Sequence, residues 1–352
     1  MSHRILITGA SGYLGGSLLA RWNTVNLPPK YDKLFTLVRT DDQASAVKQL
    51  YGATPLKFDT KNESAVRDAI VSNKITIVFF LVDATSAESQ VFFIKALAEV
   101  KNSTGIDVHF LHTSGAKLFS SHAGTPHDRP LPDTTPDLYE IQKAQEPLLE
   151  PLKPAIGANN TVVELDGQLG VHTYVFVPCI VYGQGEGFAN KISIQTVAII
   201  KAAQAARRVY DVNSTGQAVW PVCHIRDNSS LYLQILRSIL AGENPSHGKQ
   251  GYYLAASGSI AWKDLYSVMA QTLVDHDVVD DATVVPASDE ALEMMAKGLG
   301  CPKEFVSLQL GGTCTFTARN GEKLGWIPEY GADHILETAK EEVELILDTL
   351  KL

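Results

Sequence analysis

The sequence predicts a doubly wound α/β fold, in which helices cover both faces of a parallel sheet, followed by a smaller, mostly helical C-terminal lobe. Two observations predict this fold. Short apolar runs alternate with helical patterns through the first half of the 352 residues, which is typical of a parallel sheet buried on both faces. A glycine-rich turn, Gly9–Gly15, directly follows the first apolar run, Ile5-Leu6-Ile7, as a phosphate-binding turn does between a strand and a helix.

The individual elements follow from the switch between apolar runs and helical spacing. Strands are expected at Arg4–Thr8, Leu34–Val38, Thr54–Phe58, Ile75–Leu81, Asp107–His112, His172–Val177 and, late in the chain, Tyr252–Ala255. Helices are expected at Leu14–Trp22, Gln43–Leu50, Glu63–Val71, Glu88–Val100, Lys191–Arg207, Ser229–Leu240, Trp262–Leu273, Asp289–Lys297 and Ile335–Leu350. A further helix is expected to start near Pro136, because Thr135-Pro136-Asp137 supplies a capping hydroxyl and a proline at the first helical position.

Three segments read as loops or insertions, and they help to divide the chain. Trp22–Lys33 contains Pro28-Pro29, Ser120–Pro136 is rich in Pro, His, Asp and Thr, and Pro154–Gly170 is polar with several glycines. The predicted division is a nucleotide-binding domain at residues 1–182, to which residues 220–256 return, and a substrate-binding lobe at 183–219 and 257–352.

Composition excludes several classes of protein. The formal net charge of −9 argues against nucleic-acid binding, which needs a basic surface. No apolar run approaches the roughly 18 residues of a membrane span, and the first expected strand leaves no room for a signal peptide. The cysteines are far apart, at Cys179, Cys223, Cys301 and Cys314. We therefore expect free thiols in a cytoplasmic protein.

The glycine turn predicts a dinucleotide site. Glycines let the backbone approach a pyrophosphate, and a helix N-terminus offers free N–H groups and the positive end of its dipole. The spacing here is G-x-x-G-x-x-G rather than G-x-G-x-x-G. The residues expected to contact the cofactor are Gly9, Ser11, Gly12, Tyr13, Leu14 and Gly15.

A second motif, Tyr139-Glu140-Ile141-Gln142-Lys143, lies in the first turns of the helix expected near Pro136. Residues four apart share one helix face, so the phenol and the ammonium are expected to point to the same place. A phenol with a pKa near ~10 is a poor acid or base at neutral pH. A neighbouring ammonium lowers that pKa. Tyr139 and Lys143 are therefore predicted as a proton-transfer pair that also contacts the cofactor.

With these motifs the chain resembles the extended branch of the short-chain dehydrogenase/reductase superfamily, whose members carry a Rossmann domain and include NAD(P)-dependent epimerases, dehydratases and reductases. The resemblance covers nearly the whole chain. It rests on Thr8–Gly15 (T-G-x-x-G-x-x-G), Tyr139 with Lys143, Val177–Gly183 (similar to R-P-x-x-V-Y-G) and Lys323–Pro328 (K-L-G-W-x-P).

The resemblance also implies a catalytic hydroxyl at the end of the fifth strand. The sequence there is Leu111-His112-Thr113-Ser114-Gly115, where many relatives carry two successive serines. Ser114 is favoured, and Thr113 replaces it if the strand register differs by one. Pro147, eight residues past Tyr139, departs from the family pattern and is expected to kink or end the helix.

The cofactor is predicted to be NADP(H) rather than NAD(H). A guanidinium at the end of the second strand accommodates a 2′-phosphate, whereas a carboxylate there would bind the ribose of NAD. Arg39 follows that strand. By resemblance, Asp59 and Thr60 adjoin the adenine and Val82 and Asp83 pass under the cofactor. Pro178 and Ile180 belong to the segment that follows the sixth strand and also adjoins the cofactor.

No metal site is expected, because His112, His122, His127 and His224 do not have the spacing of a ligand set. The favoured function is an NADP(H)-dependent reductase of a small carbonyl compound, or the reverse oxidation of an alcohol. Two alternatives stay open: an NAD-dependent sugar-nucleotide epimerase or dehydratase, and a non-catalytic dinucleotide sensor without a Tyr/Lys pair. The second lobe carries Lys191, Lys201, Arg207 and Arg208, which a substrate diphosphate would need. A homodimer through the Tyr139 helix and Glu88–Val100 is a further possibility implied by the resemblance.

Overall fold

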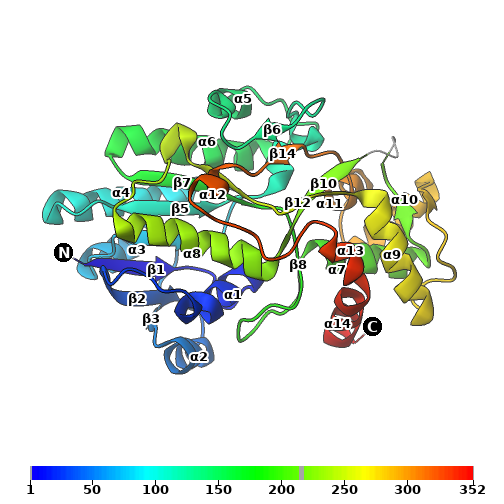
Figure 1. Cartoon of the computed structure of the whole chain (residues 1–352), viewed down its shortest axis with the longest axis horizontal. Coiled ribbons are helices and arrows are strands. Elements are labelled where there is room, and N and C mark those ends of the chain that lie inside the picture. The colour runs from blue at the N-terminus through cyan, green and yellow to red at the C-terminus, as the bar shows by residue number, and fades with distance from the viewer. Residues whose placement is uncertain (1, 214–217, 352) are drawn as a thin grey trace.

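A seven-stranded parallel sheet forms the centre of the molecule (Figure 1). The computed structural model describes residues 2–213 and 218–351. The strand order is β11-β7-β5-β4-β1-β2-β3, so the chain runs outward from β1 on one side and then restarts at β4 on the other. In sheets of this kind, ligands bind outside the carboxyl ends of the strands at that switch point. The strands are β1 (His3–Ile7), β2 (Tyr31–Leu37), β3 (Thr54–Leu56), β4 (Ile77–Phe80), β5 (His109–Thr113), β7 (His172–Pro178) and β11 (Tyr252–Ala255).

Helices cover both faces of this sheet, as expected. Helices α1 and α8 pack against each other on one face, beside α2, whereas α3, α4 and α6 cover the other face. Each layer buries its own apolar cluster, one around Tyr232 and Phe176 and the other around Phe80, Phe93 and Phe110. The bounds are α1 (Tyr13–Arg21), α2 (Asp41–Tyr51), α3 (Glu63–Ser72), α4 (Glu88–Thr104), α6 (Leu152–Leu169) and α8 (Ile225–Ala241).

The apolar run Val91–Ile94 on α4 is accounted for by this core. Phe93 and Ile94 are fully buried, and the Phe93 ring lies 5.3 Å from that of Phe80. The run therefore gives no support of its own to a dimer through α4, which stays a prediction.

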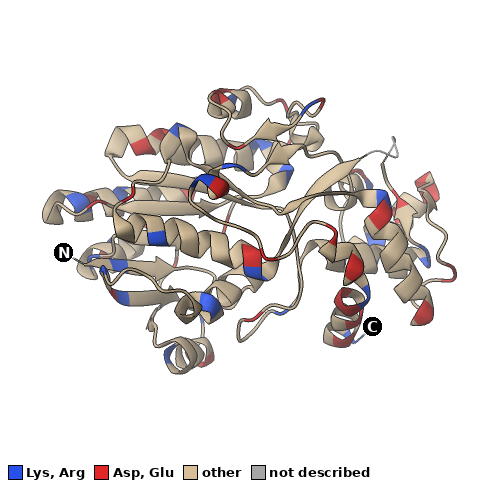
Figure 2. Cartoon of the chain, in the orientation of Figure 1, with Lys and Arg blue, Asp and Glu red and all other residues tan. Residues whose placement is uncertain are grey.

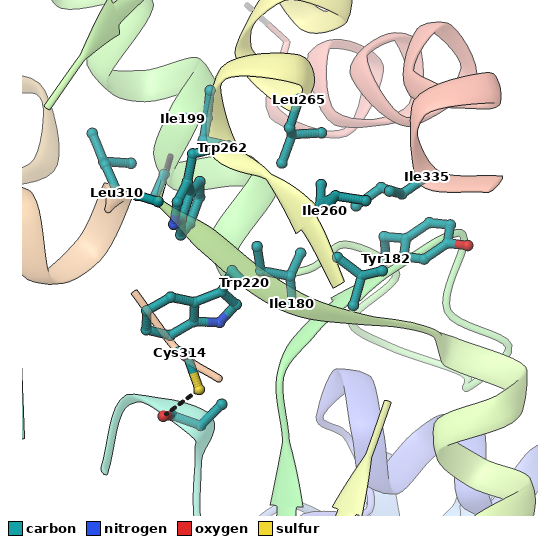
Figure 3. Close-up of a cluster of buried hydrophobic side chains, with 14 of the residues drawn as sticks. Ile180, Tyr182, Ile199, Trp220, Ile260, Trp262, Leu265, Leu310, Cys314 and Ile335 are labelled. Atoms are coloured by element: carbon teal, nitrogen blue, oxygen red, sulfur yellow. Dashed lines mark hydrogen bonds between the residues drawn. The ribbon is translucent and has the colours of Figure 1, made fainter. Parts of the chain in front are cut away.

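The C-terminal lobe is built on a second, three-stranded sheet of order β12-β10-β8. Its core is continuous with that of the first domain and centres on Trp220 and Trp262, whose rings are 5.6 Å apart (Figure 3). Acidic residues are numerous on the helices of this lobe (Figure 2). The elements are β8 (Ile180–Tyr182), α7 (Gln195–Ala206), β9 (Tyr210–Asp211), β10 (Val219–His224), β12 (Gly258–Ala261), α9 (Trp262–Asp275), β13 (Val285–Pro286), α10 (Asp289–Leu299), η5 (Lys303–Phe305), α11 (Val306–Leu310), α13 (His334–Glu337) and α14 (Ala339–Leu350).

Short elements join the two parts. The pair β6 and β14 links the loop after β5 to the C-terminal segment, and α12 packs on β11, so the chain returns to the first domain a second time. The predicted division into two domains, with one return at residues 220–256, stays a prediction. The remaining elements are η1 (Trp22–Thr24), η2 (Ala116–Phe119), η3 (Ser121–Ala123), β6 (Leu131–Pro132), α5 (Leu138–Lys143), η4 (Gly248–Gln250), β14 (Phe316–Thr317) and α12 (Asn320–Lys323).

The expectation of an insertion at Pro154–Gly170 is wrong, because α6 occupies this segment. Buried Ala155, Ile156, Val162 and Val163 recur at helical spacing and face the sheet. Pro154 falls in the first turn, where proline is tolerated, and Gly170 ends the helix at φ 63°. The polar residues that suggested a loop form the solvent side of the helix.

The helix expected near Pro136 starts later and is shorter. The Thr135 hydroxyl donates to the Pro132 carbonyl instead of capping, and α5 spans only Leu138–Lys143. Helix α5 ends before Pro147, so this proline does not kink it. No helix in the described ranges 2–213 and 218–351 is long and apolar enough to cross a membrane.

Candidate active site

The glycine turn lies where β1 meets α1, at the carboxyl edge of the sheet. Gly9 has φ 71°, and a Cβ on it would lie 3.2 Å from the Leu81 carbonyl oxygen after β4. A Cβ on Gly15 would lie 2.3 Å from the Gly9 carbonyl oxygen. Side chains at these positions would therefore fill the space that brings the strand end and the helix start together.

The N-terminus of α1 has no side-chain cap, unlike the N-termini of α2 and α3. Thr40 caps α2 and Asn62 caps α3 through their side chains, but Gly12 offers α1 no side-chain cap and no acidic residue lies in its first turn. The first N–H groups of α1, at Tyr13 and Leu14, thus lack a side-chain acceptor. An anion such as a pyrophosphate supplies the acceptor that such a helix end needs.

The ends of β2 and β3 adjoin this turn. The Gln43 amide on α2 accepts from the Arg39 backbone N–H at 2.8 Å and donates to the Ser11 hydroxyl at 3.2 Å. Arg39 is exposed, and its guanidinium has no hydrogen bond to a described residue. Asp59, after β3, is also exposed, although one of its carboxylate oxygens accepts from the Lys61 N–H at 3.0 Å.

The end of β4 forms the floor between these groups. Val82 is 44% exposed, an apolar surface that a flat cofactor ring would cover. Asp83 is half-buried, and its carboxylate accepts from the Thr85 N–H and hydroxyl at 2.7 and 2.6 Å. Burial acts to raise the pKa of Asp83, but these hydrogen bonds outweigh it and leave the pKa below its ordinary value. Asp83 is therefore ionised at neutral pH.

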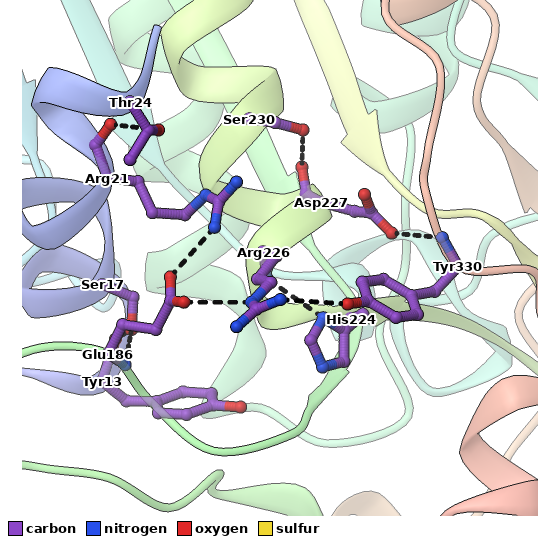
Figure 4. A network of polar contacts seen from close by, with 10 residues as sticks. All are labelled: Tyr13, Ser17, Arg21, Thr24, Glu186, His224, Arg226, Asp227, Ser230 and Tyr330. Atoms are coloured by element: carbon purple, nitrogen blue, oxygen red, sulfur yellow. Dashed lines mark hydrogen bonds and ion pairs between the residues drawn. The ribbon is translucent and has the colours of Figure 1, made fainter.

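A loop after β8 fastens the glycine turn to the rest of the molecule (Figure 4). The Tyr13 hydroxyl donates to the Gly183 carbonyl at 2.6 Å, and the Glu186 carboxylate binds Arg21 of α1 at 3.3 Å and Arg226 of α8 at 3.0 Å. Tyr13 can thus reach a cofactor only through its backbone. The sequence reading missed this loop, whose Gly187 packs directly on Gly16.

The structure separates the two candidate hydroxyls at the end of β5. The Thr113 hydroxyl pairs with the buried Tyr232 hydroxyl of α8 at 2.6 Å, so Thr113 faces the α1/α8 layer. Successive residues of a strand point to opposite faces, and the Ser114 hydroxyl is buried without a hydrogen-bond partner among the described residues. Ser114 therefore has a free hydroxyl at the carboxyl edge, and Thr113 has a structural partner.

Pro178 and Ile180 follow β7 at the same edge. Pro178 is half-buried, whereas Ile180 is fully buried in the core that joins the two parts. The Ile180 side chain thus cannot line an open site. Between them, the Cys179 thiol donates to the Ala255 carbonyl at 3.0 Å, and burial raises its pKa well above the ordinary value.

The structure does not bring Tyr139 and Lys143 to the glycine turn. Lys249 of η4, directly before β11, lies 4.4 Å from the centre of the Tyr139 ring and pairs with Glu140 at 2.7 Å. The Tyr252 hydroxyl of β11 donates to the Gln142 side chain of α5 at 3.2 Å, so α5 lies beside this edge strand. Three strands, β7, β5 and β4, stand between β11 and β1, where the glycine turn begins.

The Lys143 ammonium donates to the Tyr139 hydroxyl at 3.1 Å, as the helix spacing predicts, but a carboxylate also binds this hydroxyl. The Tyr139 hydroxyl donates to Glu164 of α6 at 2.5 Å, and Lys143 binds the same carboxylate at 2.8 Å. Burial of the phenol and its bond to Glu164 raise the pKa of Tyr139, although Lys143 acts to lower it. The expected lowering of the Tyr139 pKa is therefore reversed.

A sequence model of the NAD dependent epimerase/dehydratase family matches residues 5–248. The chain belongs to this family.

Other comparisons agree with this family at the level of the fold. The chain is 22% identical over 301 residues to the oxidase ucsJ of an Acremonium species, covering 81% of this chain and 82% of that one. It is similar to a Thermotoga maritima UDP-glucose 4-epimerase crystallised with UDP-glucose (TM-score 0.62, 15% identity, 99% of both chains). It is also similar to a Bacillus anthracis dTDP-glucose 4,6-dehydratase in complex with NAD (TM-score 0.61, 12% identity, 99% and 98% of the chains).

Within this epimerase/dehydratase fold, α6 is the helix that starts at the carboxyl edge, close to η2. Its first two turns carry no tyrosine, and their lysine, Lys153, is exposed and pairs with Glu150 at 2.7 Å. The element beside Ser114 thus offers no phenol. Tyr139 and Lys143 lie on α5 and not on α6, and their catalytic role stays a prediction.

One charged residue beside Ser114 was missed by sequence reasoning. Lys117 lies on η2, three residues after Ser114, and burial lowers its pKa to about 8. The signal was present in Gly115-Ala116-Lys117-Leu118-Phe119, where a lysine interrupts an apolar run directly after a strand. No cluster of three or more His, Cys, Asp or Glu side chains suited to a metal ion occurs within 2–213 and 218–351.

Replacing Tyr139 by Phe tests whether the Tyr139 hydroxyl serves stability or contacts a cofactor. Because the hydroxyl binds Glu164 and not a cofactor, we expect a loss of about 1 kcal/mol in the free energy of unfolding, with dinucleotide affinity unchanged. Urea unfolding and a fluorescence titration with NADP⁺ measure the two quantities. Glu164→Ala, which removes the acceptor of the same hydrogen bond, serves as control. A large drop in dinucleotide affinity for Tyr139→Phe would mean that the Tyr139 hydroxyl contacts the dinucleotide.

Proposed function

We propose that this chain is an NADP(H)-dependent oxidoreductase that reduces a carbonyl group of a small organic molecule, or oxidises the corresponding alcohol. The observation that carries the proposal is a pair of sites at one edge of the sheet whose polar groups lack a side-chain hydrogen-bond partner. The start of α1 has open N–H groups under a glycine turn, and the Ser114 hydroxyl is buried without a partner. The first fits a pyrophosphate and the second fits a substrate oxygen.

The residues present fit a nicotinamide dinucleotide. The turn at Gly9–Gly15 would hold the pyrophosphate, Asp59 with Thr60 would adjoin the adenine, and Val82 and Pro178 would flank the rings. When bound, the cofactor supplies or removes a hydride. Ser114 would orient the substrate oxygen by a hydrogen bond, and the ionised Asp83 would remain an acceptor bound to Thr85.

Arg39 supports NADP(H) over NAD(H). It is exposed at the end of β2, and its guanidinium has no acceptor among the described residues. A guanidinium can bind a 2′-phosphate with two charge-assisted hydrogen bonds. The dehydratase of Bacillus anthracis, by contrast, is in complex with NAD. The preference for a 2′-phosphate is therefore proposed from Arg39 and not from that neighbour.

The Arg39→Ala variant tests that preference. We expect its NADP⁺ affinity to fall about 10-fold while NAD⁺ affinity is unchanged, because only the 2′-phosphate contacts are lost. Arg67→Ala provides a matched control, since Arg67 is an exposed arginine that binds Glu99 on α4 at 2.8 Å. Dissociation constants for both dinucleotides are measured by fluorescence titration. An unchanged ratio of the two constants in Arg39→Ala refutes the NADP(H) preference.

The sugar-nucleotide alternative loses support from the second lobe. Of the four cations that a substrate diphosphate would need there, Arg207 binds Asp280 at 2.6 Å and Arg208 pairs with Asp281. Both guanidinium groups are therefore already neutralised by carboxylates. Lys191 and Lys201 alone make a weaker diphosphate site.

The sensor alternative gains from one observation. A dinucleotide sensor lacks the Tyr/Lys pair, and here Tyr139 and Lys143 lie beside the edge strand β11, which three strands separate from β1 and the glycine turn. Mixing the protein with NADPH and a panel of aldehydes and ketones, and following absorbance at the wavelength of the reduced cofactor, separates the two functions. Turnover supports the oxidoreductase. Dinucleotide binding without turnover of any carbonyl refutes it and supports the sensor.

A further inference from the structure

We propose that Lys117 donates the proton to the substrate oxygen bound by Ser114, and takes it back when the alcohol is oxidised. The proposal deepens the oxidoreductase function and rests on it. It assigns Lys117 as a catalytic residue in place of Tyr139.

The position of Lys117 supports this role. It lies on η2, which begins at Ala116 directly beyond the carboxyl end of β5. It follows Ser114 by three positions, so the two Cα atoms are at most about 10 Å apart, within reach of a lysine side chain and one small substrate group. Both therefore belong to the edge of the sheet that holds the glycine turn.

The turn that carries Lys117 is held from two sides. The Cys314 thiol contacts the Ala116 and Phe119 carbonyls at 3.7 and 3.4 Å, and the Gln145 amide donates to the Leu118 carbonyl at 3.0 Å. Figure 3 shows Cys314 beside this segment, at the border between the two parts of the molecule. The backbone around Lys117 is thus fixed, as a group that must meet a substrate requires.

The ammonium of Lys117 has no partner in the described chain. Its side chain is half-buried, yet its Nζ makes no hydrogen bond or ion pair with a described residue. By contrast, Lys143 and Lys153 bind Glu164 and Glu150. Desolvating an ammonium without a counter-ion costs free energy, and a group kept in this state three positions after the unpartnered Ser114 hydroxyl is a candidate for proton transfer.

The other titratable groups near Ser114 do not fit the role. His112 is fully buried, and burial lowers its pKa to about 4, so it stays neutral and closed off. Asp83 is ionised and has no proton to give. Burial and the charge of Lys117 both lower the pKa of His122, and the His122 Nε2 is hydrogen-bonded to the Gly311 carbonyl at 3.0 Å. Burial raises the pKa of Cys314, packed against η2, to about 12, so it stays a thiol.

The pKa of Lys117 suits proton transfer near neutral pH. Burial lowers its pKa to about 8, and no described charged group counters this. An acid or base with a pKa near the working pH is present in both forms and transfers protons efficiently. Lys117 can therefore act as an acid below pH 8 and as a base above it.

The step balances as follows. During reduction, the carbonyl carbon gains a hydride from a reduced nicotinamide dinucleotide, and the electron pair of the C=O π bond moves to oxygen. An N–H bond of the Lys117 ammonium breaks as the O–H bond of the alcohol forms. Lys117 is left as a neutral amine and regains its proton from water. Oxidation of the alcohol runs the same exchange in reverse.

A labelling experiment on the full-length protein tests the state of Lys117 without turnover. Acetic anhydride acylates only the neutral amine, so the rate of acetylation of each lysine, followed by mass spectrometry across pH 6–11, reports its titration. We expect Lys117 to label with a midpoint near 8, below the value of about 10.4 for a lysine in a model peptide. A Lys117 midpoint at the model-peptide value overturns the proposal.

Kinetics test the role itself. We expect Lys117→Met to lower kcat for carbonyl reduction by about 100-fold or more and to abolish the fall in kcat/KM above pH 8, while the thermal unfolding midpoint does not decrease. Lys117→Arg keeps a cation that cannot release a proton, so it does not restore the pH dependence. Lys153→Met is the control and keeps the parent profile.

The outcomes separate this inference from the proposed function. An intact kcat and an unchanged pH profile in Lys117→Met overturn the role of Lys117 and leave the oxidoreductase standing. A parent protein that turns over no carbonyl overturns both. A folded Lys117→Met with parent-like dinucleotide affinity and a collapsed kcat supports both, because a purely structural role would alter unfolding instead.

Discussion

Replacing Gly15 by Ala is expected to lower NADP⁺ affinity by at least about 100-fold. The new Cβ would lie 2.3 Å from the Gly9 carbonyl oxygen and 2.9 Å from its carbonyl carbon. Both atoms are backbone, so the clash is relieved only if α1 moves away from β1. That movement takes the N–H groups of the first turn out of reach of a pyrophosphate, and each charge-assisted hydrogen bond lost costs about 1.5–3 kcal/mol.

A second glycine offers a matched control for this experiment. Gly157 lies inside α6, and a Cβ on it would meet nothing within 4 Å. Gly157→Ala should therefore stabilise the protein by up to about 1 kcal/mol and leave NADP⁺ affinity unchanged. Fluorescence titration measures the affinity, and circular dichroism checks that Gly15→Ala is folded. A folded Gly15→Ala protein that binds NADP⁺ as the parent does would place the pyrophosphate elsewhere.

Replacing Asp133 by Ala should give the largest loss of stability, about 4 kcal/mol in the free energy of unfolding. Asp133 is 1% exposed, and its carboxylate accepts from three backbone N–H groups: Leu254 at 3.0 Å, Arg319 at 2.8 Å and Asn320 at 2.8 Å. One side chain thus joins the loop after β5, the edge strand β11 and the segment that starts α12. Truncation leaves three buried donors unsatisfied, each at a cost of about 1–3 kcal/mol.

Urea unfolding of the variant and of an exposed neighbour measures this effect. Asp128→Ala, in the same loop, should change the free energy of unfolding by less than about 0.5 kcal/mol, because Asp128 is exposed. Asp133→Asn retains one carbonyl acceptor and should fall between the parent and Asp133→Ala. A loss below 1 kcal/mol for Asp133→Ala would mean that water replaces the carboxylate.

Asp133 also shows the kind of feature that sequence reasoning cannot reach. It lay inside Ser120–Pro136, a segment expected to be only a loop, and its three partners come from residues 254, 319 and 320. Nothing local marks such a residue, since its hydrogen bonds join segments more than one hundred residues apart. The Glu186 link to Arg21 and Arg226 likewise joins residues 165 and 40 positions apart.

Local patterns predicted what local physics controls. The strands of the central sheet and the helices α1, α2, α3 and α4 fall within a few residues of their expected bounds, because apolar periodicity and glycine turns act over short stretches. The failure at Pro154–Gly170 has the opposite cause. The polar face of α6 is wide, so its narrow buried stripe looked like a loop.

The sequence by itself therefore determined the parallel α/β fold, the family and the glycine turn, because each depends on residues close together in the chain. The tertiary structure alone decided which reactive groups lie on neighbouring strands. It placed Ser114 and Lys117 just beyond β5, and Tyr139 and Lys143 beside the edge strand β11. Side-chain spacing along a helix shows which residues share a face, but only the packing of that helix against η4 and α6 shows what the face contacts.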